Sequence, residues 1–140
     1  MLKIPRSIHE AMIAHARRDA PLEACGYLAG RRSGSDGDGD EIAAHFPMRN
    51  VDASAEHFAF DPAEQFAVFK EAGKQGLKLI ACYHSHPATP ARPSEEDIRL
   101  AYDPNIHYFI VSLAGPEPVV KSFRIVGGEV THESFEVSAA

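Results

Sequence analysis

The strongest constraint on the fold is an apolar segment in the middle of the chain, Leu77–Tyr83, in which only Lys78 is charged. The segment follows a glycine, Gly76, and its length suits a β-strand better than a helix. A strand with consecutive apolar side chains is usually covered on both faces, as in the centre of a layered sheet. The segment therefore predicts a central strand in a sheet with helices packed against it.

A first helix is predicted before this strand. Apolar residues recur at helical spacing from Ile8 to Ala16. Ser7 precedes Glu10 by the three positions of a capping box. The helix should therefore start at Ser7 and end at Pro21.

A second helix is predicted from an Asp-Pro pair at 61–62, a cap followed by proline at the first helical position. Phe66, Phe69 and Ala72 recur at helical spacing and, with Val68 beside them, should form its core face. Gly76 should end it, because glycine is common just after a helix.

The remaining strands complete a mixed pattern. They are predicted at 2–4, 24–30, 41–48, 108–113, 119–126 and 129–137, the last two as a hairpin joined at Gly127-Gly128. Helices alternate with strands early in the chain, whereas strands follow one another late. This order predicts an α/β fold with a mixed central β-sheet and helices packed on it.

The segment 33–40 is rich in glycine and aspartate and predicts a solvated hairpin turn. Its aspartates alternate as they do at the start of a calcium-binding loop. However, Glu41 stands where such a loop has its glycine, and Pro47 stands where it has its bidentate glutamate. A calcium site is therefore not expected.

The composition is that of a globular domain, with 44% hydrophobic and 24% charged residues, so a single domain, 1–140, is expected. The net charge of −6 argues against nucleic acid and anionic membranes as partners, because both bind basic patches.

No apolar segment approaches the ~18 residues of a membrane span. The start of the chain lacks a signal-peptide pattern, so a cytoplasmic location is expected. Cys25 and Cys82 should be buried, reduced thiols.

A possible metal site follows the apolar strand, where residues 84–87 read His-Ser-His-Pro. Side chains two positions apart on a strand share a face, so His84 and His86 should point into one site at the end of the strand. A short helix is expected at 94–100, and Asp97 falls in its first turn. The connecting loop is long enough to bring Asp97 over the two histidines.

Two imidazoles and one carboxylate make three protein ligands. Structural zinc sites usually have four, whereas three leave a position for water, whose pKa falls to about 7 on catalytic zinc. Non-haem iron sites use the same ligand types and stay open as a minor alternative. Zinc deaminases need His-x-Glu and Cys-x-x-Cys, and neither occurs here. Cys82 shares the strand parity of the histidines but lies farther back, so it is expected in the core.

The pattern H-S-H-P-x6-S-x-x-D over residues 84–97 resembles the JAMM motif of the MPN+ (Mov34/PAD-1) metalloprotease family, which includes prokaryotic JAB-type members. That family also has an upstream glutamate, commonly followed by Cys-Gly, and the segment 21–30, P-L-E-A-C-G-Y-L-A-G, resembles it. The resemblance spans about residues 2–126. It implies a three-layer, cytidine-deaminase-like fold, with helices on both sides of the sheet, and one zinc ion per chain.

The resemblance also implies roles for individual residues. Glu23 would be the general acid/base that takes a proton from the metal-bound water and delivers it to the leaving amine. Without the motif, a surface glutamate would be the simpler interpretation. Ser94 matches a serine that supports the oxyanion, although a helix N-cap is the alternative use of its hydroxyl. Ser85 should face away from the metal and make local hydrogen bonds, and Cys25 should serve packing.

The reaction implied by the resemblance is hydrolysis of a peptide or isopeptide bond. The substrate would be the C-terminal Gly-Gly of a ubiquitin-like or sulfur-carrier protein, or its amino-acid adduct. Every position of the motif is present, which favours an active enzyme. The alternative is a non-catalytic scaffold module of the same family, because some members have lost their ligands. A homodimer is compatible with the sequence.

Overall fold

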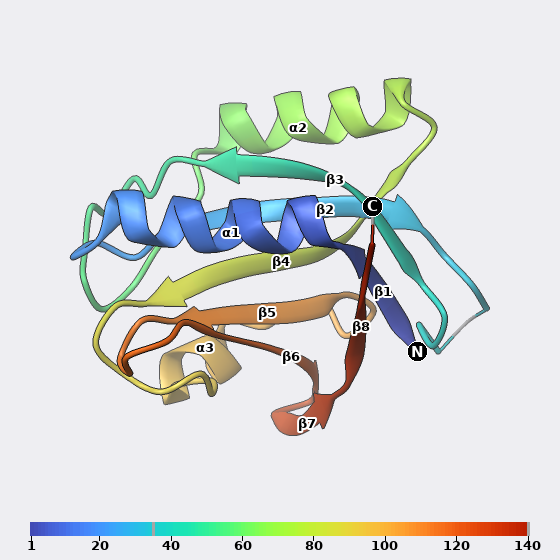
Figure 1. Cartoon of the computed structure of the whole chain (residues 1–140). Coiled ribbons are helices and arrows are strands. Elements are labelled where there is room, and N and C mark those ends of the chain that lie inside the picture. The colour runs from blue at the N-terminus through green and yellow to red at the C-terminus, as the bar shows by residue number, and fades with distance from the viewer. Residues whose placement is uncertain (35, 140) are drawn as a thin grey trace.

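The computed structural model describes residues 1–34 and 36–139, which form three helices and one eight-stranded sheet (Figure 1). The strand order in the sheet is β7-β6-β5-β4-β2-β3-β1-β8. In chain order, the elements are β1 (Leu2–Pro5), α1 (Arg6–Asp19), β2 (Cys25–Arg31), β3 (Glu41–Met48), α2 (Pro62–Lys74), β4 (Lys78–His86), α3 (Glu95–Arg99), β5 (His107–Ser112), β6 (Val119–Val126), β7 (Glu129–Glu133) and β8 (Phe135–Ser138).

β4 lies inside the sheet, antiparallel to β2 and parallel to β5. Its residues from Ile80 to His86 are all buried, which confirms the central strand that the apolar segment predicts. The strand begins at Lys78 and continues beyond Tyr83 to include both histidines. Parallel and antiparallel pairs occur together, so the mixed sheet is also confirmed.

α1 covers one face of the sheet (Figure 1), and its Met12 is completely buried in the main apolar cluster. The predicted capping box of Ser7 and Glu10 is wrong. The helix begins at Arg6 without a side-chain cap. Because Pro5 ends β1 and the helix starts at the next residue, Ser7 already lies inside the first turn.

α2 lies over β3 and β4 and begins where the sequence predicts. The Asp61 carboxylate accepts a hydrogen bond from the Ala63 amide at 3.0 Å, which caps the helix. The predicted core face is only partly right. Ala72 is buried, but Phe66 and Phe69 are 64% and 65% exposed.

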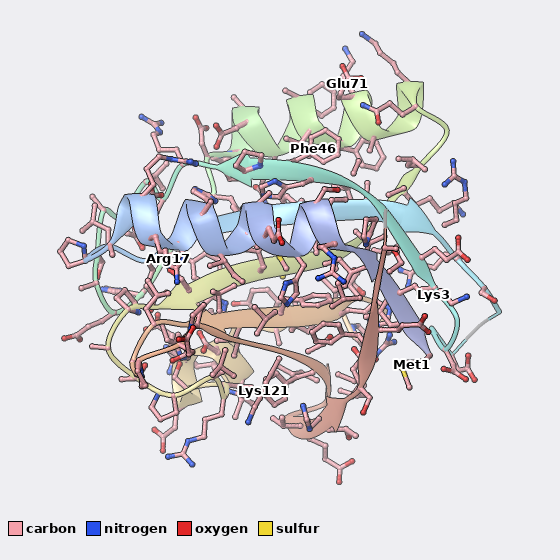
Figure 2. All side chains as sticks on the ribbon, in the orientation of Figure 1. Met1, Lys3, Arg17, Phe46, Glu71 and Lys121 are labelled. Carbon is pink, nitrogen blue, oxygen red and sulfur yellow. The ribbon has the colours of Figure 1, made fainter. Side chains whose placement is uncertain are left out.

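Two members of the predicted face, Val68 and Ala72, lie on the sheet side of α2, and Gln65 lies there in place of Phe66 and Phe69. Gln65 donates a 2.8 Å hydrogen bond to the hydroxyl of Tyr27 on β2, and Val68 and Ala72 follow on the same side of the helix. Figure 2 shows Phe46 of β3 on the sheet side of α2, where it packs against the cluster that contains Ala72. A polar residue therefore takes part in the face of α2 that meets the sheet, which hydrophobic periodicity cannot reveal.

The predicted turn at Gly127-Gly128 is confirmed, because both glycines have positive φ, 57° and 84°. The predicted returning strand, 129–137, is in fact two strands. β7 pairs with β6, whereas β8 pairs in parallel with β1 at the other end of the strand order. This places Phe135 and Val137 against the main apolar cluster, which a continuous hairpin strand would leave uncovered.

The loop between β2 and β3 is described except for Ser35, which lies outside the described residues. Asp36 and Asp38 are exposed, as expected of a solvated turn. Asp40 differs, because its side chain is completely buried and accepts hydrogen bonds from a loop amide and from His107. A buried carboxylate needs such partners to offset the loss of water.

Side chains along β4 alternate between the two faces. Tyr83 faces α1, where its hydroxyl lies 2.6 Å from His15 Nδ1, so His84 faces the side of α2 and α3. A mixed sheet with helices is thus confirmed, while the likeness to cytidine deaminase stays a prediction. In the described part of the chain, no helix is long and apolar enough to cross a membrane.

Candidate metal centre and active site

His84 and His86 lie at the end of β4 on one face of the sheet, as strand parity predicts. They are 6% and 4% exposed, and their Nε2 atoms are 3.1 Å apart. Phe58 stacks on the His84 ring, with the ring centroids 4.7 Å apart. Because β4 is held between β2 and β5, both imidazoles are positioned by the sheet itself.

α3 brings Asp97 to these histidines. Its Oδ2 lies 3.0 Å from His84 Nε2 and 3.1 Å from His86 Nε2. The same oxygen accepts a hydrogen bond from the Ser94 amide at 2.9 Å, and Ser94 Oγ accepts one from the Asp97 amide at 3.0 Å. This capping box starts α3 and holds the carboxylate in place. The structure therefore brings together the three side chains predicted as ligands, while their binding of zinc stays a prediction.

A hydrogen bond to the Pro90 carbonyl shows how His86 is protonated. His86 Nδ1 lies 2.9 Å from this oxygen, which can only accept, so Nδ1 carries the proton. In a neutral imidazole, Nε2 then presents a lone pair, and here it faces Asp97 Oδ2. Two lone pairs face one another favourably only with a positive charge between them. Metal-bound histidines commonly donate their other N–H in this way, so the donor set fits a divalent cation.

The pKa shifts of Asp97 and His86 also indicate a site that suits a cation. Burial alone would raise the pKa of Asp97, but the adjacent imidazoles of His84 and His86 outweigh it and hold that pKa well below its usual range. Burial alone would lower the pKa of His86, but the adjacent carboxylate of Asp97 raises it. The site thus favours positive charge among these side chains. Within residues 1–34 and 36–139, no other group of three or more His, Cys, Asp or Glu has metal-binding spacing.

Glu23 lies two residues before the first residue of β2 and is 4% exposed. Cys25 pairs with His84 across the two strands, so Glu23 is level with His86 on the same face. Its Oε1 is buried without a hydrogen-bond partner among the described residues. Burial raises the pKa of Glu23 to about 8; His86 opposes this shift and Asp97 adds to it. An unpartnered buried oxygen costs about 1–3 kcal/mol, which suggests that a ligand or water completes the site.

Ser85 faces away from the metal centre and makes the local hydrogen bonds that the sequence predicts. Its Oγ accepts a 2.7 Å hydrogen bond from the Ala24 amide, and its own amide donates to the Ala24 carbonyl at 2.9 Å. These bonds attach the residue after Glu23 to the strand that carries the histidines.

The Ser94 hydroxyl can serve both of its predicted roles. The cap uses an oxygen lone pair, because Oγ accepts from the Asp97 amide. The hydroxyl proton stays free to donate, and Ser94 is exposed on the surface. The cap therefore leaves the hydroxyl able to donate, and its support of an oxyanion stays a prediction.

A cavity of about 360 Å³ adjoins the metal centre on the His84 side. Aromatic and aliphatic side chains form most of its wall, and its lining residues come from β2, the loop before α2, α2, β4, α3, the loop after α3 and β5. Its aromatic residues are Tyr27, Phe58, Phe60, Tyr102 and Tyr108. Concave, mainly apolar sites of this size hold extended peptide or small-molecule groups.

Comparison with known proteins identifies the relatives of the chain. Residues 5–126 match the family of prokaryotic homologs of the JAB domain. The chain belongs to this family. It is 40% identical over 138 residues to the CysO-cysteine peptidase of Mycobacterium tuberculosis, which covers 98% of this chain and 91% of the relative.

Two further comparisons agree. The probable TtuB-protein conjugate cleaving protease of Thermus thermophilus is 38% identical over 102 residues, 72% of this JAB domain and 64% of the relative. A solved structure from Desulfitobacterium hafniense is 45% identical and has a TM-score of 0.88, covering 100% of this chain and 94% of that chain. The fold and the family are therefore shown by both sequence and structure.

The two cysteines of this JAB domain are free and buried, as predicted. Burial raises the pKa of both thiols to about 12, so they are neutral near physiological pH. Cys82 forms part of the cavity wall beside His84. A neutral thiol is neither a nucleophile nor a metal ligand, which agrees with a packing role for both.

Two parts of the JAB domain site were missed in the sequence. The aromatic wall of the cavity comes from separate elements that converge only in the fold. The loop 50–60, which carries Phe58 over His84, has no periodic pattern that would connect it with the site. A Phe-x-Phe pair at 58–60 was the only local signal available.

Proposed function

We propose that this JAB domain is a zinc-dependent peptidase or isopeptidase. It hydrolyses the bond between the C-terminal glycine of a Gly-Gly-tailed carrier protein and an amine, such as a free amino acid. The observation that carries the proposal is the convergence of His84, His86 and Asp97 beside the unpartnered carboxyl of Glu23. The names of the two relatives, a CysO-cysteine peptidase and a TtuB-protein conjugate cleaving protease, support a carrier conjugate as the substrate.

Zinc, held by His84, His86 and Asp97, would supply a Lewis acid for the scissile carbonyl and a water of lowered pKa. Three protein donors leave a coordination position for that water. Hydrolysis needs no change of oxidation state, so redox-inert zinc suits the reaction better than iron.

Glu23 moves the protons. Its carboxylate takes a proton from the attacking water and returns it to the leaving nitrogen, because amines leave poorly unless protonated. Burial raises the pKa of Glu23 to about 8, so it is a stronger base than an exposed carboxylate. A nearby cation would bring that pKa down towards neutral pH, where a group both accepts and releases protons efficiently.

The positions of Glu23 and the cavity give the substrate a direction. Glu23 is level with His86, whereas the cavity extends back along β4 over Cys82. The leaving amine must lie near Glu23, so the acyl side, the carrier tail, extends towards the cavity.

The test uses carrier proteins that end in Gly-Gly and their C-terminal cysteine adducts, incubated with zinc-loaded protein and measured by intact mass. We expect the adduct to lose the cysteine, a chelator to stop this and zinc to restore it.

Glu23→Gln should lower turnover by about 10²–10⁴-fold with zinc still bound. Ser94→Ala should lower it by about 10²–10³-fold, while Ser94→Thr keeps a hydroxyl and retains most of the activity. Adducts that stay intact with zinc-loaded protein would contradict the proposal and favour a scaffold module.

Three further parts of the proposal rest on less specific observations. The two buried, free thiols support a reducing, cytoplasmic location. The continuous sheet, to which both β1 and β8 belong, supports a single domain over 1–140. A homodimer stays a prediction that sedimentation of the purified protein would test.

A further inference from the structure

We propose that Asn50 is a positioning residue, which fixes the backbone of Glu23 and the loop over the metal centre as one hydrogen-bonded unit. The inference rests on the proposed function only for its effect on turnover. Its structural part concerns the contacts of a single side chain between β3 and the loop 51–60.

All the hydrogen-bonding capacity of the Asn50 amide is used. Its Nδ2 donates to the Glu23 carbonyl and to the His57 carbonyl, both at 3.0 Å. Its Oδ1 accepts from the Asp52 amide at 3.1 Å and from the Ala59 amide at 3.2 Å. The four partners come from two segments that are distant in the sequence.

These partners permit only one orientation of the amide. Both groups opposite Nδ2 are carbonyl oxygens, and both groups opposite Oδ1 are backbone N–H groups. A flipped Asn50 would place oxygen against oxygen and N–H against N–H. The backbone therefore recognises an asparagine specifically at this position.

The backbone of Glu23 depends on this contact. Glu23 precedes β2, and its amide donates to the Ser54 carbonyl at 2.8 Å while its carbonyl accepts from Asn50. Both backbone groups of Glu23 thus bond to the segment 50–54. Because Oε1 has no hydrogen-bond partner among the described residues, the backbone bonds of Glu23 are the hydrogen bonds that hold this residue in position.

The same side chain also positions Phe58. Asn50 bonds the carbonyl of His57 and the amide of Ala59, the residues on either side of Phe58. Phe58 stacks on His84 with an interplanar angle of 23°. One amide therefore sets the position of the proton carrier and of the ring that covers a proposed ligand.

Asn50→Asp tests this role, because it keeps the acceptor oxygen but places a second oxygen against the Glu23 and His57 carbonyls. We expect kcat to fall about a hundredfold, since a displacement of about 1 Å can have that effect. KM should change less than about threefold, and zinc should stay at one per chain, because the proposed ligands lie on β4 and α3. Asn50→Ala should show the same pattern without added charge. Asn105→Asp adds the same charge at an exposed position and should behave as wild type.

Hydrogen exchange gives a measurement that does not depend on activity. In both Asn50 variants, the amides of Glu23 and of residues 51–60 should exchange at least tenfold faster, while those of β4 stay protected. Unchanged exchange would overturn the positioning role even if no substrate were cleaved. Unchanged kcat in an active protein, or a loss confined to Asn50→Asp, would also overturn it. An inactive wild type with faster exchange in the variants would contradict the proposed function alone.

Discussion

Glu23 combines two properties that oppose folding. Its carboxyl is buried, and one of its oxygens has no hydrogen-bond partner in the described structure. Natural structures keep few such groups, because each one lowers stability by about 1–3 kcal/mol. Ser85 and Asn50 hold the adjoining backbone in place despite this cost. A carboxyl held where it is least stable is typical of a group needed for proton transfer.

The pH dependence of stability should reveal Glu23 in the metal-free protein. Burial raises its pKa from 4.5 to about 8, so the folded state retains a proton that the unfolded state releases in this interval. The contribution of Glu23 to stability is therefore lost as the pH rises from about 4.5 to about 8. Urea unfolding of wild type and Glu23→Gln, on both sides of this interval, should show wild type losing stability relative to the variant. A difference that does not change with pH would contradict the raised pKa.

Some single residues of the site could be predicted and others could not. His84 and His86 are two positions apart on a strand, and Asp97 starts a helix, so local rules place all three side chains. No local pattern marks Asn50 as part of the site. Its side chain bonds the backbone carbonyl of Glu23, which is distant in the sequence. A hydrogen bond to a distant main-chain atom leaves no motif in the sequence, because any residue can supply that atom.

Among the elements, α2 shows how a polar contact overrides hydrophobic periodicity. Its helical period is predicted correctly, but Gln65 faces the sheet and bonds Tyr27, while Phe66 and Phe69 face outward. β4 was easier to predict, because a strand buried on both faces has apolar residues at consecutive positions. The buried face of an element can thus be predicted from its sequence only where apolar side chains alone form that face.

The exposure of the α2 phenylalanines predicts that they contribute little to stability. Phe66→Ala and Phe69→Ala should each change the free energy of unfolding by less than about 1 kcal/mol, as surface substitutions usually do. Phe109→Ala is the matched control, because Phe109 is completely buried and its truncation should cost about 3–5 kcal/mol. Urea unfolding measures all three. A large loss at Phe66 or Phe69 would show that another surface covers α2.

For the whole molecule, the pairing of β1 with β8 is the feature that the sequence could not predict. It joins Leu2 to Phe135, nearly the full length of the chain. Local patterns predict a hairpin strand over 129–137, because nothing in that segment shows where its partner lies. The core supplies the reason, since Phe135 and Val137 pack against the main apolar cluster, to which β1 and α1 contribute.

The proposed metal centre joins α3 to the end of β4. α3 has five residues, none of them buried. Two of its side chains attach it to the sheet: Ile98 packs against an apolar cluster that includes Ile110, and Asp97 contacts the two histidines. Zinc removal should therefore lower Tm, and α3 with its flanking loops should lose protection from hydrogen exchange before β4 does. Zinc at about a hundredfold above its Kd should stabilise the fold by about 2.7 kcal/mol. His86→Ala is the control, because its Tm should not respond to a chelator. An equal response in that variant would place the stabilising metal elsewhere.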